Sequence, residues 1–294
     1  MNEYNYVQTA PQQAPQQTPQ PDKKRSGSSS VWIILLILGA LLFFTGLILY
    51  KTVGSGEKYN VINYSNSFDA DDINKLDLDI AWADLTINKS NDDKIHVDAK
   101  NVIKGFTAEV NNNVFKTRYE KKHGFISHVH IPFFIDDEYK DATVEISLPE
   151  KIYDSFVLDM GAGETYITGL SCDQFKMECG AGSVNINRLE CSNADIDCGA
   201  GELSVNNIDC EHKLDIDGGA GEININGTLG GIDLDQGVGE FTFTGTINGN
   251  INADGGLGSM EFNLTNPSSD FGKNGKYTID IDTGVGSSSV NYDQ

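Results

Sequence analysis

Apolar and polar residues alternate along the second half of the chain in a pattern that restarts at a regular interval. The clearest copy runs from Met160 to Glu164 (MGAGE), and the first glycines of seven such copies are separated by 19, 19, 20, 18, 19 and 28 residues. Every second residue on either side of the glycines is apolar, which is the period of a β-strand with one buried face. Recurrence at a nearly fixed interval of this length is typical of a repeat architecture.

Each unit is predicted to consist of a strand, a Gly-x-Gly corner and a second strand. A sharp corner requires a positive φ or a close backbone approach, and glycine permits both because it has no Cβ atom. We therefore assign a structural role to both glycines of each copy. These glycines are Gly161, Gly163, Gly180, Gly182, Gly199, Gly201, Gly219, Gly221, Gly237, Gly239, Gly256, Gly258, Gly284 and Gly286.

A single unit cannot bury its apolar face, so successive units must stack to form a core. Strands paired at about 4.8 Å would then build an all-β, β-helix-like β-solenoid of ~19-residue repeats over residues 151–294. A rolled sheet or a sandwich of successive hairpins is the alternative that the same alternation permits.

The N-terminal part of the chain is predicted to anchor this domain to a membrane. Residues 1–30 are rich in Gln, Pro and Ser and are predicted to form a disordered cytoplasmic tail. Residues 31–50 carry no charge and match the thickness of a bilayer, so the fold class includes one transmembrane helix before the β-domain. A cleaved signal peptide is the alternative, although its apolar region would be shorter.

The orientation of this helix is predicted from the positive charges beside it. Lys23, Lys24 and Arg25 directly precede the apolar run, and the positive-inside rule then places the N-terminus in the cytosol. The chain is therefore expected to be a single-pass cell-membrane protein with an extracellular C-terminal domain.

Between the helix and the regular repeats, we expect a linker over 51–69 and a divergent N-terminal part of the β-domain over 70–150. Residues 76–87 align with a later repeat, with Asp79 in its acidic position and Ala81 and Ala83 in place of the glycines. This segment is interpreted as a first unit that caps the array. Residues 100–141 break the period, which indicates either a binding insertion or a long hairpin that covers the end of the array.

The formal net charge of −22 argues against nucleic acid as a partner, because its phosphates would be repelled. In six copies an aspartate stands two residues before the first glycine, and a stacked row of carboxylates could bind Ca²⁺. The calcium-binding β-roll, however, has a nine-residue repeat with its Asp after the glycines. A solvated outer row is therefore favoured and no metal site is predicted, with these residues as the Ca²⁺ candidates: Asp159, Asp197, Asp217, Asp235, Asp254 and Asp282.

The cysteines follow the repeat. Cys172, Cys191 and Cys210 are 19 residues apart, as are Cys179 and Cys198. This spacing indicates columns of buried thiols and does not match the close cysteine pairs of zinc sites. A disulfide between neighbouring repeats stays an open alternative.

No catalytic residue and no cofactor site is predicted. His128 and His130 would share one face of a strand and could begin a metal site, but a third ligand is not identifiable. The Gly-x-Gly-Glu motif lacks the strand–loop–helix context and the lysine of a nucleotide-binding loop, and its recurrence favours an architectural role.

The single N-terminal membrane helix expected over 31–50, the strand from Val144 to Pro149 and the repeats together resemble the putative adhesin family, the DUF4097 group of bacterial β-strand-repeat surface proteins. The resemblance covers about residues 70–294. It implies a cell-surface, β-solenoid-like domain without established catalytic residues, and it implies relatives associated with envelope-stress systems.

The predicted function is that of a membrane-anchored extracellular β-repeat protein of the adhesin type. It is expected to be non-enzymatic and to bind a surface component, either an envelope protein or a glycan, or to act in an envelope-stress response. One alternative is a β-helix enzyme acting on a polysaccharide, and another is a purely structural surface spacer. Residues 151–294 contain 6 Lys and Arg against 23 Asp and Glu, so an acidic polysaccharide would be repelled.

Overall fold

The computed structural model describes residues 61–119 and 142–293, all of which belong to one compact unit, Lys58–Gln294. Their regular elements are strands and one short 3-10 turn, η3 (Ser268–Asp270). The strands are β1 (Val61–Asp69), β2 (Lys75–Trp82), β3 (Asp84–Lys89), β4 (Lys94–Ile103), β5 (Thr107–Asn111), β6 (Val114–Tyr119), β7 (Thr143–Leu148), β8 (Ile152–Ile167), β9 (Leu170–Ile186), β10 (Leu189–Leu229), β11 (Ile232–Ile247), β12 (Ile251–Leu264) and β13 (Ile279–Tyr292).

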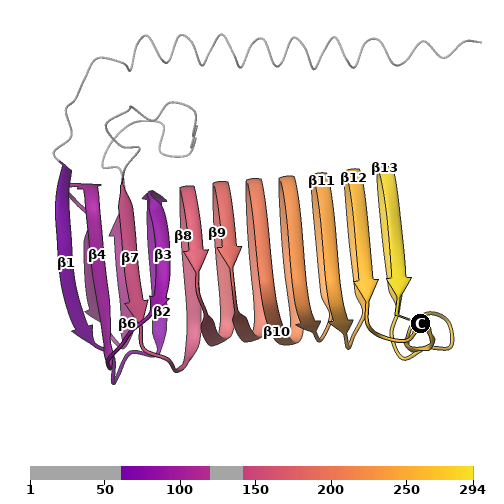
Figure 1. The fold of residues 1–294 in the computed structure, drawn as a ribbon, viewed down its shortest axis with the longest axis horizontal. Coiled ribbons are helices and arrows are strands. Elements are labelled where there is room, and N and C mark those ends of the chain that lie inside the picture. The colour runs from indigo at the N-terminus through magenta and orange to yellow at the C-terminus, as the bar shows by residue number, and fades with distance from the viewer. Residues whose placement is uncertain (1–60, 120–141, 294) are drawn as a thin grey trace, which may run out of the picture. The chain divides into compact units, whose positions relative to one another are not determined.

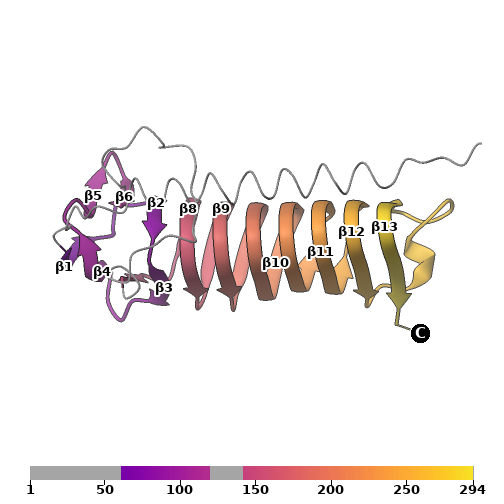
Figure 2. The same cartoon turned by 90° about the horizontal axis from the view of Figure 1, so that it is seen from above.

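These strands form one 13-stranded sheet whose main path runs β1-β4-β7-β3-β8-β9-β10-β11-β12-β13. From β8 onward every neighbouring pair is parallel, and the strands lie side by side in chain order (Figures 1 and 2). Successive repeats therefore pair with each other directly, as the regular spacing of the glycines requires.

Each long parallel strand consists of two arms joined at its Gly-x-Gly corner. The pairing continues across the corner, so that Ala162 of β8 lies opposite Ala181 of β9. The arms before the corner form one layer and the arms after it form a second (Figure 2). The apolar side chains of both layers point between them.

The first unit of the array is formed by β2 and β3. β2 pairs with the first arm of β8 and places Asp79 opposite Asp159, while β3 pairs with the second arm and places Ile87 opposite Ile167. The register expected for residues 76–87 is thereby confirmed. β2 and β3 therefore form a complete repeat unit, although alanines stand in place of its two corner glycines.

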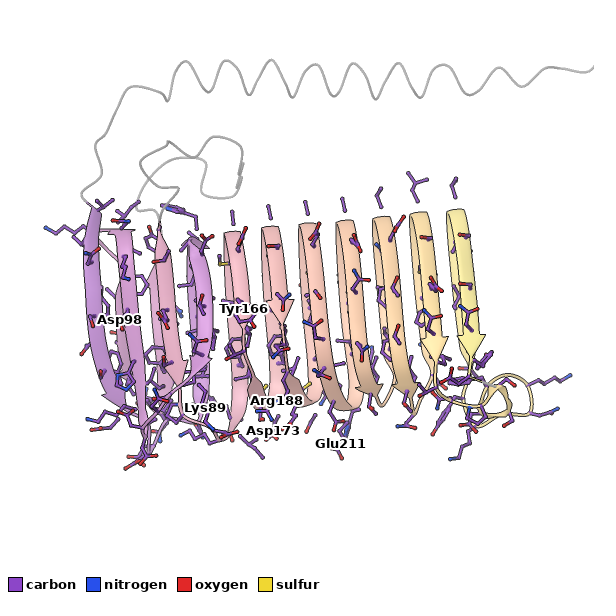
Figure 3. The ribbon with its side chains drawn as sticks, in the orientation of Figure 1. Lys89, Asp98, Tyr166, Asp173, Arg188 and Glu211 are labelled. Atoms are coloured by element: carbon purple, nitrogen blue, oxygen red, sulfur yellow. The ribbon has the colours of Figure 1, made fainter. Side chains whose placement is uncertain are left out.

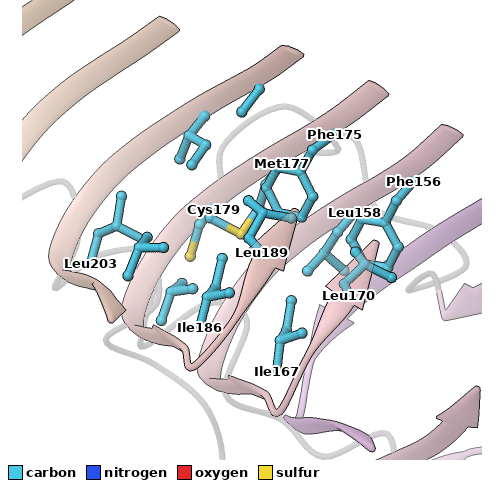
Figure 4. Packing of buried hydrophobic residues seen from close by; sticks show 14 of the residues in the cluster. Phe156, Leu158, Ile167, Leu170, Phe175, Met177, Cys179, Ile186, Leu189 and Leu203 are labelled. Atoms are coloured by element: carbon cyan, nitrogen blue, oxygen red, sulfur yellow. The ribbon is translucent and has the colours of Figure 1, made fainter. Parts of the chain in front are cut away.

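The core consists of columns of buried side chains, one residue from each repeat. The rings of Phe156 and Phe175 stack at 5.3 Å between centroids with an interplanar angle of 2°, as Figure 4 shows. Leu158 and Ile167 face each other across the two layers and are fully buried. The apolar columns that the alternation predicted are therefore the inward ones.

Different structures cover the two ends of the parallel array. At the N-terminal end, β6 and β5 extend the first layer, while β7, β4 and β1 extend the second. Phe106 lies between these extensions and packs its ring against Tyr64 and Tyr119. At the other end, the excursion from 265 to 278 folds back so that Phe271 contacts Tyr277 and Tyr292.

The predicted fold class is wrong in two respects, of which the first concerns the sheet. Within the described residues the sheet is open and mixed, because β1–β4, β4–β7 and β5–β6 are antiparallel pairs beside the parallel ones. It is therefore not the uniform β-solenoid that was expected. The apolar alternation could not separate these outcomes, since side chains alternate with a period of two in parallel and antiparallel strands alike.

The second respect is the transmembrane helix. The predicted membrane partner and the predicted single-pass cell-membrane localisation, with an extracellular C-terminal domain, depend on this helix and are corrected with it. In residues 61–119 and 142–293, no helix is long and apolar enough to cross a membrane, which overturns the predicted anchor. Residues 1–30 and the predicted span 31–50 lie outside the described residues. The prediction used the length and apolarity of that run, which indicate compatibility with hydrocarbon but do not establish a helix across it.

Candidate functional site

The glycine corners determine how closely neighbouring repeats approach. Gly182 has a φ of +135°, and a Cβ atom at this position would lie 2.0 Å from the carbonyl oxygen of Gly163 in the preceding repeat. Only glycine fits there, because any side chain would collide with the neighbouring backbone as well as strain its own. The corner is consequently a strip of backbone with no side chains except those of the residue between the two glycines.

The residues between the glycines form a continuous apolar row, which we name the corner ridge. The pairing places each member beside its counterpart in the next repeat. A row of short side chains projects from the upper edge of the parallel strands in Figure 3. The members of the corner ridge are Ala162, Ala181, Ala200, Ala220, Val238, Leu257 and Val285.

The corner ridge becomes larger and more exposed toward the C-terminal end. Its first four members are alanines, whereas Val238, Leu257 and Val285 are 48%, 50% and 70% exposed. At about 4.8 Å per repeat, the seven side chains extend over about 30 Å. This row is a contiguous exposed apolar patch with bare glycine backbone on both sides, a kind of surface that is typical of interaction sites.

Carboxylates flank the corner ridge on both sides. After the glycines, one row contains Glu164, Glu202, Glu222 and Glu240, and Ser183, Ser259 and Ser287 take this place in the other repeats. An open depression of about 550 Å³ lies where this row passes the ridge, bordered by Ala220, Val238 and the Glu202, Glu222 and Glu240 side chains. The second acidic row precedes the glycines.

That second row contains the Ca²⁺ candidates, and the structure places them on the outer face of the first arms. The pairing places Glu178 between Asp159 and Asp197, and Asp254 between Asp235 and Asp282. None of the six is buried. In the part of the chain that the structure describes, no three or more His, Cys, Asp or Glu side chains are arranged to hold a metal ion.

The close stacking of these carboxylates alters their titration. Burial, followed by the neighbouring charges of Asp195 and Asp217, raises the pKa of Asp197 above its usual value. In the preceding outer row, the hydrogen bond from Arg118 lowers the pKa of Asp77, since Arg118 donates to both carboxylate oxygens at 3.0 and 2.8 Å. The outer acidic face therefore contains both repelling and neutralised carboxylates.

The cysteines lie in the two predicted columns. Cys172 is the register partner of Cys191, and Cys179 is the partner of Cys198. All five are free thiols, and four are buried while Cys198 is partly exposed. The buried thiol columns expected from the spacing are confirmed.

Part of the predicted insertion can be located. Residues 100–119 contribute the end of β4 and the β5–β6 hairpin, which extend the sheet beyond the repeats. Residues 120–141, which include His128 and His130, lie outside the described residues. The predicted boundaries at 51–69, 70–150 and 151–294 stay predictions.

Sequence reasoning missed the corner ridge because it treated the residue between the glycines as a variable position. The signal was present in the sequence, since this residue is small or apolar in every copy and changes from Ala to Val or Leu toward the C-terminus. It also did not anticipate the uncharged polar side chains that lie beyond the glutamate row on the outer face of the second arms. On the second arms, the row from Tyr166 through Asn185 and Ser204 is polar and uncharged, and Figure 3 shows Tyr166 on this face.

Comparison with known proteins relates this architecture to others. The sequence profile described as Toastrack DUF4097 matches residues 73–289. No curated protein matches the chain in sequence. Among solved structures, the putative adhesin of Parabacteroides merdae ATCC 43184 is 13% identical with a TM-score of 0.41, over 81% of this chain and 98% of that one.

Two further solved structures are similar to the same extent. The putative lipid binding protein of Parabacteroides distasonis ATCC 8503 is 15% identical with a TM-score of 0.45, over 80% of this chain and 98% of that one. The putative adhesin of Bacteroides fragilis NCTC 9343 is 12% identical with a TM-score of 0.40, over 81% of this chain and 100% of that one.

Proposed function

The chain belongs to the Toastrack DUF4097 family, as its repeats predicted, and we propose that it is a non-enzymatic binding protein of the adhesin type. Its contact surface is the corner ridge together with the two acidic rows beside it. The partner is an amphipathic, positively charged segment of another protein.

The observation that carries this proposal is the exposure of the corner ridge. Apolar side chains are common on protein surfaces when they stand singly, but contiguous rows rimmed by polar residues mark interaction sites. Val238, Leu257 and Val285 are consecutive members of one row and are each about half exposed or more. Because the flanking residues are glycines, a partner can reach these side chains without displacing others.

The flanking negative charges favour a partner that carries positive charge. Glu202, Glu222 and Glu240 lie on one side of the ridge and Asp235 and its stacked neighbours on the other. A segment with basic residues on both flanks of an apolar stripe would complement this arrangement and would be steered toward it at low salt. An anionic glycan, a nucleic acid or an anionic lipid surface would be repelled.

The dimensions of the ridge favour a long, thin partner. Its seven side chains cover about 30 Å, which a helix of about 20 residues also spans. The apolar stripe of an amphipathic helix recurs once per turn, about every 5.4 Å, close to the spacing of about 4.8 Å between repeats. Such a segment can place several apolar side chains along the ridge.

The shape of the surface supports binding over catalysis. The small pocket that Leu257 and Val285 help to line has a volume of about 10 Å³, room for about one water molecule and not for a substrate. The Glu202, Glu222 and Glu240 carboxylates are exposed on an open edge, whereas a catalytic carboxylic acid is usually held in an apolar pocket that raises its pKa. A polysaccharide-acting enzyme is therefore the less favoured alternative. A role in envelope stress stays a prediction.

Titration of the protein with a synthetic probe tests the proposal. The probe is a fluorescent helical peptide of about 20 residues with leucine on one face and lysine on the other. We expect binding to the full chain, a loss of at least about tenfold in the Val238→Ser, Leu257→Ser and Val285→Ser triple variant, and weakening by salt.

Two controls make this experiment decisive. The double variant Val61→Ser and Val110→Ser removes two exposed valines far from the ridge, each 42% exposed, and should bind as the wild type does. A second peptide with glutamate in place of lysine should not bind. Equal binding by the ridge variant and the control variant, or no binding of the lysine peptide to the wild type, would contradict the proposal.

A further inference from the structure

Three of the buried thiols belong to one inward column near the start of each repeat. Cys172 lies opposite Cys191 in the pairing of β9 with β10, and Cys210 occupies the same place one repeat later, within β10. Neighbouring strands are about 4.8 Å apart, and the Cα atoms of a disulfide are usually 4.4–6.8 Å apart. The spacing of the column is therefore compatible with a covalent bond between adjacent members.

The adjacent pair of Cys191 and Cys210 is distinguished by the hydrogen bonds that the Cys210 thiol donates. The Sγ atom of Cys210 lies 3.7 Å from the carbonyl oxygen of Ser192, the residue next to Cys191, and 3.2 Å from that of Lys213. Its side chain thus reaches toward the repeat that contains Cys191.

We propose that Cys191 and Cys210 form a disulfide bond that joins two adjacent repeats when a disulfide-containing oxidant such as oxidised glutathione is present. No additional metal or cofactor is required. The bond does not involve the corner ridge, so it is independent of the proposed binding function.

The reaction is an ordinary thiol–disulfide exchange in two steps. The Cys210 thiolate attacks one sulfur of the oxidant, forms a mixed disulfide and releases one thiolate. Cys191 then loses its proton and attacks the Cys210 sulfur, which releases the second thiolate. Two protein thiols become one disulfide, the oxidant is reduced to two thiols, and the two protons end on these.

The state of Cys210 favours it as the first nucleophile. Interaction with the Cys191 side chain lowers the pKa of Cys210, whereas the same interaction together with burial raises that of Cys191. Because the thiolate is the reactive form, the proton is removed more readily from Cys210. Access to the buried sulfur requires a brief opening of the local pairing, so the reaction is expected to be slow.

The other cysteines are less suited to this bond. Burial raises the pKa of Cys172 to about 12, and that of Cys198 also to about 12, which leaves very little thiolate at neutral pH. Since the chain has five cysteines, pairing of Cys191 with Cys210 leaves Cys172 reduced. Cys179 and Cys198 are register partners, but burial raises the pKa of both thiols.

Peptide mapping of the full chain tests the assignment directly. The protein is incubated with oxidised glutathione, denatured, alkylated and digested at acidic residues, because trypsin would leave Cys191 and Cys210 in one peptide between Arg188 and Lys213. We expect a linked pair of peptides that contain Cys191 and Cys210, with the other three thiols alkylated. Alkylation of all five thiols, or a link between any other pair, would overturn the proposal.

Thermal unfolding gives a second measurement. Closing a loop of about 20 residues should raise the melting temperature of the oxidised protein by about 5–10 °C over the reduced protein. The difference should vanish in Cys191→Ser and in Cys210→Ser and should persist in the matched control Cys179→Ser. Should a serine variant fail to fold, the peptide map of the wild type still decides the question.

Discussion

At the scale of single residues, the second glycine of each corner is a position that does not tolerate a side chain. Gly182 combines a positive φ with a distance of 2.0 Å between an added Cβ atom and a backbone oxygen. Backbone oxygens cannot rotate away as a side chain can, so the whole repeat would have to move. Gly169 is different, since an added Cβ atom would meet only the flexible side chain of Arg188 at 3.4 Å.

This contrast gives a prediction with an internal control. Gly182→Ala should lower the free energy of unfolding by about 2–4 kcal/mol, because it adds both backbone strain and a collision. Gly169→Ala should change it by no more than about 0.5 kcal/mol. Urea denaturation of both variants measures the difference, and a similar small effect at both positions would show that the corner can relax around a side chain.

At the scale of the strands, the outer face of the first arms is organised in rows that cross the sheet. A row of like charges with a spacing of about 4.8 Å is unfavourable, and the cations near it relieve this only locally. Lys213 contacts both Asp215 and Asp233, and Lys176 lies 3.1 Å from Glu178. The contribution of each carboxylate to stability therefore depends on its neighbours.

The contributions of two aspartates on this face to the stability of the fold should depend on pH in opposite directions. The pKa of Asp77 is lowered by Arg118, so its stabilising contribution is present above the unfolded pKa and is lost as the pH falls through the folded one. The pKa of Asp197 is raised by burial and by Asp195 and Asp217, so its contribution is present at low pH and is lost as the pH rises through the folded pKa.

At neutral pH we therefore expect Asp197→Asn to raise the melting temperature by about 1–2 °C and Asp77→Asn to lower it. Melting curves between about pH 3 and pH 7 measure both effects, and the difference between each variant and the wild type should shrink toward the acidic end. Asp98→Asn, an exposed position on β4, is the control. A destabilised Asp197→Asn variant at neutral pH would show that the row is not repulsive.

The sequence predicts the strands of the parallel array more clearly than it predicts the strands that extend the array or the exposure of its corners. The period-two columns identified Phe156, Leu158 and their counterparts as inward, and aligned residues 76–87 with later repeats, because these features depend on local alternation. The antiparallel pairing of β4 with β7 has no comparable signal, since it joins segments about 50 residues apart. The corner ridge was not foreseen because exposure depends on the bend of the backbone and not on the residue type.

At the scale of the whole array, each repeat buries its apolar face only against its neighbours, so the ends are special positions. The last interval is 28 residues long compared with the usual 19, and its extra length lies in the excursion from 265 to 278 that carries Phe271. Phe271 is 7% exposed and packs against Tyr277 within the excursion and Tyr292 at the end of β13. This excursion replaces the contact that a further repeat would supply.

Phe271→Ala should accordingly destabilise the C-terminal end before the rest of the array. The loss of a buried ring should cost about 2–4 kcal/mol, and in a chain of neighbour-stabilised repeats this loss is confined largely to the units beside it. Hydrogen exchange should accelerate in β13 and β12 while β8 and β9 keep their protection, and Lys273→Ala in the same excursion should leave exchange unchanged. Equal acceleration in β8 and β13 would mean that the array unfolds as one cooperative unit and that the excursion does not act as a local cap.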